Sequence, residues 1–256
     1  MDNLFRFKQF SVKHASSAMK VGTDAVLLGA WMTVDGAHRM LDVGTGTGVI
    51  ALLGAQRRAT LDATTPFLIE ALDIEANAAR EATGNFENSP WASSLQAVHT
   101  SLQDWVADPL HHHQYDLIFS NPPYFDQAWK PDQEERRLAR HSDTLLFEDL
   151  VQAALALLKP EGRLAVVLPA LEGEEFQRLA ERTLYEGSWR LEMTRVLRVF
   201  TVRRKPVKRL LMEFVKAQEI RPCQTDELVI HAPDGSFSAD YRSLTGDFYL
   251  DQLFVK

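Results

Sequence analysis

The sequence predicts an open α/β fold in which helices alternate with the strands of one mostly parallel sheet. Residues 40–43, 67–72 and 115–120 are short apolar runs of strand length, and helical patterns separate them, as in βαβ units. A glycine-rich turn follows the first run, Asp73 the second and a proline corner the third. Ligands of open α/β sheets bind beyond the carboxyl ends of the strands, so these three positions form the candidate site.

Length and charge indicate the size of the fold and bear on its partners. The chain has 256 residues, of which 45% are apolar, enough for one α/β domain with a sizeable core. Its 28 Lys and Arg against 35 Asp and Glu give a net charge of -7. This value argues weakly against a nucleic-acid partner, although such binding depends on local patches and not on the total.

Cysteine content and hydropathy bear on metal binding and location. Cys223 is the single cysteine, so the chain forms no internal disulfide, and His111, His112 and His113 lie in a polar loop. We therefore expect no metal site. The sequence shows no charged-then-apolar signal at Met1 and no apolar run of ~18 residues. We expect a soluble cytoplasmic protein with no membrane partner.

The N-terminal segment is predicted to hold a strand and a helix. Residues 5–10 alternate aromatic and polar side chains, as in a short half-buried strand. Residues 25–31 form an apolar helix that Thr23 or Asp24 can cap.

The turn from Gly44 to Gly48 has the pattern Gly-x-Gly-x-Gly between the strand at 40–43 and a helix at 49–55. Such a turn lets backbone amides approach a negative or polar ligand group closely. The spacing differs from the usual dinucleotide fingerprint, and no Gly-Lys-Ser/Thr indicates a P-loop. Asp73 lies at about the 20–25-residue distance expected of a ribose-binding acid. The two features together are more specific than either alone.

The stretch Asn121-Pro122-Pro123-Tyr124 forms a stiff corner, because two prolines cannot continue a strand. The Asn121 amide oxygen and the Pro122 carbonyl can accept the two hydrogens of a planar nitrogen, and the Tyr124 ring can stack on the group that carries it. Neither the Asn121 amide nor the Tyr124 side chain is a good nucleophile or base. The corner therefore favours orientation of a weak nitrogen nucleophile toward an electrophile that a cofactor supplies. The alternative is a proline-terminated strand end with a packed tyrosine.

The remaining elements continue the alternation until the C-terminal region. A charged stretch at residues 126–142, with Arg136, Arg137, Arg140 and His141, is predicted to be a loop or a lid. The other expected elements are helices at 75–88, 148–158 and 173–182 and strands at 95–100 and 164–168.

Residues 191–202 and 209–215 alternate and are predicted to form a long antiparallel hairpin that closes the sheet edge. The region between positions 195 and 216 is strongly basic, with Glu213 as its single acid. It can contact phosphates, or it can be an edge strand that charge keeps soluble. Its eight basic residues are Arg195, Arg198, Arg203, Arg204, Lys205, Lys208, Arg209 and Lys216.

With Asp42-x-Gly44-x-Gly46-x-Gly48, Asp73 and Asn121-Pro122-Pro123-Tyr124 in this order, residues 37–168 resemble the class I S-adenosyl-L-methionine-dependent methyltransferases that modify planar nitrogens. Within that group, Phe5-x-Phe7-Lys8-Gln9-Phe10, the run at 19–31 and Phe248-Tyr249-Leu250 resemble the bacterial tRNA adenine-N6 methyltransferases. Members of that family modify adenosine 37 beside the anticodon of a valine tRNA. The likeness extends over nearly the full chain.

The resemblance implies a Rossmann-like class I methyltransferase fold, with a mostly parallel seven-stranded sheet closed by an antiparallel C-terminal hairpin. It implies a single domain overall. Residues 1–36 would cover the cofactor and substrate cleft, and residues 37–256 would form the methyltransferase domain with its basic hairpin.

The resemblance also implies roles for individual residues. Gly44, Gly46 and Gly48 would shape the methionine side of the S-adenosylmethionine pocket, with Asp42 near the amino group and Asp73 at the ribose hydroxyls. Asn121 and Pro122 would accept from the adenine N6 amine, Asn121 would also border the cofactor, and Tyr124 would stack on the base. The family usually has an acid after the third strand, where this chain offers Ser101 as the cofactor contact and Asp104 further on. The expected tRNA-binding residues are Lys20, Arg203, Arg204, Lys205, Lys208 and Arg209.

The implied function is N6-methylation of adenosine 37 in tRNA(Val), with the anticodon loop as partner and no obligate protein partner. Two alternatives share the same corner: N5-methylation of a protein glutamine, which the basic hairpin disfavours, and N2-methylation of an rRNA guanine. A third is a nucleotide-binding protein in which the corner is only structural. No general base is assigned, because a methylated ammonium loses its proton readily to water.

Overall fold

The computed structural model describes residues 4–14, 21–123 and 147–254. Lys20, Tyr124 and the charged stretch at 126–142 lie outside the described residues. Within these ranges no helix is both long and apolar enough to cross a membrane.

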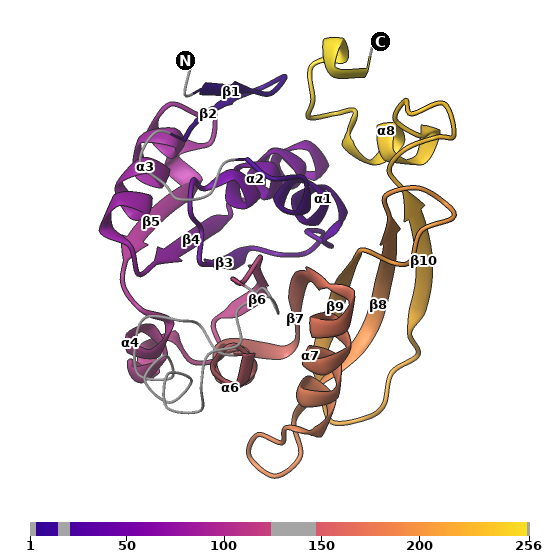
Figure 1. Ribbon diagram of the computed structural model, residues 1–256. Helices are drawn as coiled ribbons and strands as arrows, with labels where there is room; N and C mark the ends of the chain where they lie inside the picture. The colour runs from indigo at the N-terminus through magenta and orange to yellow at the C-terminus, as the bar shows by residue number, and fades with distance from the viewer. Residues whose placement is uncertain (1–3, 15–20, 124–146, 255–256) are drawn as a thin grey trace, which may run out of the picture.

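A mixed sheet of eight strands organises the described chain, in the order β10-β8-β9-β7-β6-β3-β4-β5 (Figure 1). Most neighbouring pairs are parallel; β9 alone is antiparallel to both of its neighbours, β7 and β8. The strands are β3 (Arg39–Val43), β4 (Leu68–Asp73), β5 (Leu95–His99), β6 (Tyr115–Ser120), β7 (Leu158–Pro169), β8 (Arg190–Phe200), β9 (Arg209–Ala217) and β10 (Gln224–Val229). The predicted α/β fold with its antiparallel hairpin is confirmed.

The sheet has one strand more than the seven expected. β10 pairs with β8 in parallel, so the β8–β9 hairpin lies inside the sheet and not at its edge. The first four residues of β10 are exposed, and only Leu228 is fully buried. A strand with so little burial has no apolar alternation in its sequence, which is why it was not predicted.

Helices cover both faces of the sheet, because successive strand residues point to opposite sides. Met40, Leu117 and Ala165 belong to the core beneath α1, α2 and α3, whereas Leu41 and Ile118 belong to the core beneath α6 and α7. The helices are α1 (Thr23–Trp31), α2 (Val49–Leu61), α3 (Ala76–Glu87), α4 (Leu102–Ala107), α6 (Phe147–Leu157), α7 (Ala170–Arg182) and α8 (Ala239–Thr245), with 3-10 turns η1 (Ala92–Ser94), η2 (Pro109–His111) and η3 (Asp251–Phe254).

The N-terminal strands pack against residues 248–251 near the C-terminus. Strands β1 (Leu4–Arg6) and β2 (Ser11–Lys13) form a small antiparallel ladder. Phe7 stacks on Tyr249, and the Lys8 amide donates to the Phe248 carbonyl at 2.8 Å. Lys8 also forms an ion pair with Asp251 at 2.7 Å. The closing aromatic segment therefore anchors the N-terminal strands.

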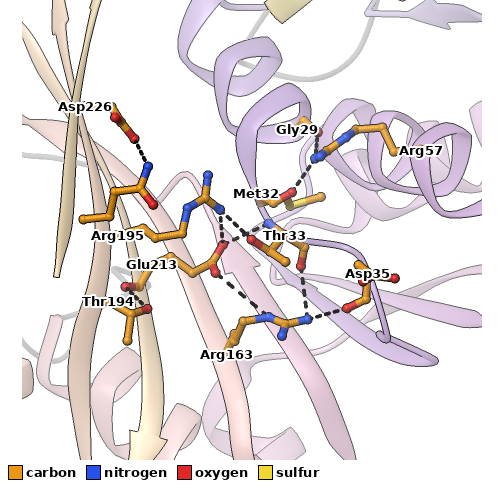
Figure 2. A network of polar contacts seen from close by, with 11 residues as sticks. Gly29, Met32, Thr33, Asp35, Arg57, Arg163, Thr194, Arg195, Glu213 and Asp226 are labelled. Carbon is orange, nitrogen blue, oxygen red and sulfur yellow. Dashed lines mark hydrogen bonds and ion pairs between the residues drawn. The ribbon is translucent and has the colours of Figure 1, made fainter. Parts of the chain in front are cut away.

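A buried carboxylate ties the end of α1 to the hairpin (Figure 2). Glu213 of β9 accepts from the Thr33 amide at 2.9 Å and lies 3.3 Å from Arg195 and 4.0 Å from Arg163. The Arg195 guanidinium covers the Trp31 ring at 4.4 Å. Glu213 is almost fully buried, so these partners offset the free-energy cost of removing its charge from water.

Candidate active site

The three predicted strand ends lie next to one another, on the side of the sheet where the parallel strands end. Val43 pairs with Leu72 of β4 and with Ser120 of β6, in parallel ladders. The Ser120 hydroxyl also donates to the Val43 carbonyl at 2.7 Å, which holds the ends of β3 and β6 together. The glycine turn, Asp73 and Asn121 are therefore neighbours, and the first two are joined by a hydrogen bond.

The glycine turn uses its three glycines for two different purposes. All three have positive φ, at 72° for Gly44, 55° for Gly46 and 80° for Gly48, a region that favours glycine. A Cβ on Gly44 or Gly46 would meet nothing within 4 Å, so their Cα atoms face open space that a ligand can approach. A Cβ on Gly48 would lie 2.4 Å from the Phe86 ring, so this glycine allows α3 to pack against the turn.

Asp42 lies at the end of β3 under the glycine turn and is fully buried. The Thr45 hydroxyl donates to its Oδ2 at 2.7 Å, whereas Oδ1 has no hydrogen-bond partner among the described residues. Burial raises the pKa of this carboxyl to about 7. A cationic amino group that donates to Oδ1 would satisfy this buried oxygen and would favour the ionised form of the carboxyl.

Asp73 fixes the turn to β4. Its Oδ2 accepts from the Gly46 amide at 2.8 Å, and its Oδ1 accepts from the Glu75 amide at 2.9 Å. Each carboxylate oxygen has a second lone pair, so Asp73 can still accept from two hydroxyls of a bound sugar. The side chain thus holds the backbone and keeps acceptor capacity at the edge of the site.

Asn121 is half-buried after β6, and Pro122 behind it is buried. The Asn121 Oδ1 atom is shielded from solvent and has no hydrogen-bond partner among the described residues. A buried amide oxygen left without a donor costs free energy, which a ligand N–H can recover. The structure places Asn121 at the site; Tyr124 lies outside the described residues.

Ser101 is engaged in helix capping. Its hydroxyl accepts from the Asp104 amide at 3.0 Å and donates to the Asp104 carboxylate at 2.7 Å, at the start of α4. The Ser-x-x-Asp spacing is a capping signature that the sequence already carried. The expected cofactor contact of Ser101 would therefore have to share a hydroxyl that this cap uses.

The basic turn between β8 and β9 lies on the same side of the sheet, where the parallel strands end. Pro169, at the carboxyl end of β7, pairs with Arg209, and Val199 pairs with Arg209 on the other side. Arg203 forms an exposed ion pair with Glu227 of β10 at 2.6 Å. The exposed basic residues of this turn are Arg203, Arg204, Lys205 and Lys208.

Arg209 differs from the other expected tRNA-binding residues. Its Nε lies 2.6 Å from Asp24 Oδ2 on α1, and its side chain is 14% exposed. The expected cap of α1 by Thr23 or Asp24 is wrong, because Gly22 occupies the N-cap position and no side chain caps the helix. Arg195 and Lys216 of the basic stretch also point inward, so it is less positive at the surface than its sequence indicates.

Two polar residues of the site region were not predicted. Thr45, bonded to Asp42, could have been recognised from its place inside the glycine turn. Asn85 of α3 is buried and bonds the turn at Thr47, but an asparagine in an amphipathic helix carries no sequence signal. Among the described residues, no group of three or more His, Cys, Asp or Glu side chains is placed to hold a metal ion.

Comparison with known proteins places the chain in a family. Residues 11–181 match the methyltransferase small domain family. The tRNA1(Val) (adenine(37)-N6)-methyltransferase of Trichodesmium erythraeum is 42% identical over 97% of this chain and 98% of its own length. The protein of the same name from Flavobacterium psychrophilum is 41% identical over 96% and 99%.

Solved structures share the fold at low sequence identity. A predicted O-methyltransferase from Agrobacterium tumefaciens superposes with a TM-score of 0.66 and 17% identity, covering 88% of this chain and 96% of its own. The 16S rRNA N2 G1207 methyltransferase of T. thermophilus gives 0.52 and 18%, covering 83% and 51%. The chain therefore belongs to the methyltransferase small domain family and, within it, to the family of the tRNA1(Val) (adenine(37)-N6)-methyltransferases.

Proposed function

We propose that this protein transfers a methyl group from S-adenosylmethionine to N6 of adenosine 37 in tRNA1(Val). One observation carries the chemistry: Asp42 and Asn121, at the ends of β3 and β6, each present a buried side-chain oxygen with no partner among the described residues. The glycine turn begins two residues after Asp42, so a cofactor acceptor and a substrate acceptor lie on neighbouring strands.

The residues present fit S-adenosylmethionine. Asp42 Oδ1 would accept from its amino group, and the open Cα faces of Gly44 and Gly46 would admit its methionine part. Asp73, already held by the Gly46 amide, would accept from the ribose hydroxyls. When bound, the cofactor supplies an electrophilic methyl group on a sulfonium sulfur.

Asn121 and Pro122 would orient the nitrogen that is methylated. The lone pair of adenine N6 is delocalised into the ring, so the amine is a poor nucleophile. Acceptance of its two hydrogens by the Asn121 Oδ1 and the Pro122 carbonyl favours pyramidal geometry and directs the lone pair at the methyl group. Tyr124 would stack on the base, a contact that contributes about 1–3 kcal/mol. The methylated ammonium then loses a proton to water.

The tRNA would approach along the basic turn. Arg203, Arg204, Lys205 and Lys208 are exposed at the edge that carries Asn121, and Lys20 would add to them. Contacts to phosphate fix register and orientation without reading sequence. A base in the anticodon loop is already partly unstacked, so its extrusion costs less than the few kcal/mol of duplex base flipping. We also propose that the reaction takes place in the cytoplasm. Residues 1–36 would cover the cleft that holds the cofactor and the substrate.

Methyl transfer to alternative acceptors tests the proposal. The protein is incubated with labelled S-adenosylmethionine and, in parallel, unmodified total tRNA, rRNA and a release-factor protein with a glutamine target. The label is expected in tRNA, as N6-methyladenosine by nucleoside mass spectrometry. An anticodon stem-loop with guanosine in place of adenosine 37 is expected to remain unlabelled. Label in protein, or as N2-methylguanosine in rRNA, would refute the assignment of tRNA as the substrate. It would leave the proposed role of Asn121 and Pro122 in orienting a planar nitrogen unchanged.

A further inference from the structure

Asn85 of α3 connects the N-terminal strand β2 to the glycine turn. Its Oδ1 accepts from the Lys13 amide at 2.8 Å, and its Nδ2 donates to the Lys13 carbonyl at 3.0 Å. The same Nδ2 donates to the Thr47 carbonyl at 2.8 Å. The residue is 3% exposed, so solvent cannot replace these bonds. One side chain thus joins two segments that are 34 residues apart in sequence.

The Asn85 amide acts as a strand partner for Lys13. It pairs with both the N–H and the C=O of that residue, while the other edge of β2 pairs with β1. A carboxamide has one acceptor oxygen and two N–H donors, and all three are used here. An aspartate in this position would keep the acceptor but would turn an oxygen toward the carbonyls of Lys13 and Thr47. A glutamine would place its amide one methylene too far along.

Several side chains hold the glycine turn, among them Asp42 at Thr45, and Asn85 also bonds the N-terminal strand β2. Asp73 holds the Gly46 amide, and the Phe86 ring lies against Gly48. Asn85 holds Thr47, between these two glycines. The position of the Thr47 peptide therefore depends on how β2 is seated, and the seating of β2 depends on the turn.

We propose that Asn85 is a positioning residue that couples cofactor binding at the glycine turn to the placement of the N-terminal segment. This inference rests on the proposed function, because it requires S-adenosylmethionine at the turn. Coupling of two equilibria is reciprocal, so a ligand that orders the turn stabilises β2, and loosening of β2 weakens ligand binding. The cofactor-loaded protein is thereby expected to hold β2 more firmly than the free protein.

Hydrogen exchange with and without S-adenosylmethionine tests the coupling. In the wild type, the cofactor is expected to slow amide exchange in peptides that contain Thr47 and in peptides that contain Lys13. In Asn85→Asp the turn peptide should still respond, whereas the response of the Lys13 peptide should be lost. The KM for the cofactor should rise roughly tenfold, with kcat changed much less, because two neutral hydrogen bonds are removed away from the reacting atoms. Asn88→Ala, at the exposed asparagine that follows α3 and donates to the Gly84 carbonyl of the same helix, serves as the matched control.

A second pair of variants covers the case in which Asn85→Asp does not fold. Lys13→Pro removes the amide that donates to Asn85, at the last residue of β2, and leaves the Asn85 side chain in place. Lys13→Ala keeps the amide and removes the charge. The proline variant is expected to reproduce the raised KM and the alanine variant the wild-type value.

The outcomes separate the inference from the function. Wild-type cofactor affinity and wild-type exchange responses in both Asn85→Asp and Lys13→Pro would overturn the coupling. A wild-type protein that neither binds S-adenosylmethionine nor methylates tRNA would instead overturn the proposed function.

Discussion

Asp24 and Arg209 form an ion pair, with Nε 2.6 Å from Oδ2, that joins the first turn of α1 to the first residue of β9. Arg209 pairs with Pro169 at the carboxyl end of β7, so the ion pair lies on the side of the sheet where the parallel strands end. This ion pair distinguishes Arg209 from the exposed basic residues of the turn between β8 and β9. The two kinds of arginine are therefore expected to respond differently to substitution.

Arg209→Ala should lower stability and leave the salt dependence of tRNA binding unchanged. The change removes a charged hydrogen bond and leaves Asp24 without this partner at a site where little solvent reaches. The expected loss is about 1–3 kcal/mol of unfolding free energy, measured by urea denaturation. An unchanged unfolding midpoint, together with a flatter salt dependence, would assign Arg209 to the RNA surface.

Arg204→Ala should weaken tRNA binding and flatten its dependence on salt. Each lost phosphate contact lowers the slope of log affinity against log salt by about 0.7–0.9. Replacing Arg203, Arg204 and Lys205 together should lower the slope further, although Arg203 gives up its ion pair with Glu227 to reach a phosphate. Arg221→Ala is the control, because Arg221 lies in the connection after β9, at the opposite edge of the sheet. Equal slopes for all variants would make the basic turn a solubilising feature.

Asn121→Ala should keep cofactor affinity and lose most turnover. The unpartnered Oδ1 would be an acceptor for the reacting amine, and removal of one preorganised group of this kind typically lowers kcat by about 10²–10³-fold. Calorimetric titration of S-adenosylmethionine and single-turnover methylation of tRNA give the two values. Asn121→Asp, which keeps an acceptor oxygen in place, is expected to fall between wild type and alanine. Equal losses of affinity and turnover would refute the assigned role.

The sequence predicts the parts of this site that depend on local patterns. A glycine turn after a short apolar strand and a proline pair after another are both recognisable within a few residues, and the structure puts them at one edge. The pairing of Asp24 with Arg209 is not recognisable in this way. Those residues are 185 positions apart, and only the antiparallel register of β7 and β9 brings Arg209 to that edge.

Burial is the second property that the sequence does not show. Lys216 belongs to the basic stretch by composition, yet it is fully buried, donates to the Leu158 carbonyl at 3.0 Å and lies over the Tyr185 and Trp189 rings. Burial lowers the pKa of this amine to about 8. A count of charges along the sequence cannot distinguish such a lysine in β9 from Lys205, which is exposed in the turn between β8 and β9.

Gly48→Ala should be much more destabilising than Gly36→Ala. Both glycines have positive φ, at 80° and 66°, so alanine strains the backbone by about 1–2 kcal/mol at either position. Only at position 48 would the new methyl group also collide with the Phe86 ring, which adds about 1–3 kcal/mol of overpacking. Unfolding in urea measures both losses. Similar losses would mean that α3 moves away from the turn at no cost.

Asp42→Asn should change how stability and cofactor affinity depend on pH. The pKa of Asp42 is raised from 3.8 to about 7 because the carboxyl is buried, so the folded state keeps a proton that the unfolded chain releases in this range. The stability that this group contributes is complete below the unfolded pKa and is lost as pH rises toward 7. Without cofactor, Asp42→Asn should therefore unfold a few degrees above the wild type at about pH 8 and close to it at about pH 4.

The cofactor reverses the sign of this effect. Its amino group favours the ionised carboxylate, so wild-type affinity should rise as pH increases through about 7, whereas the affinity of Asp42→Asn should be weak and should lack this rise. Calorimetric titrations at about pH 6, 7 and 8 measure both profiles. Parallel profiles would show that another group titrates, and Asp42 would then be a structural partner of Thr45 with no contact to the ligand.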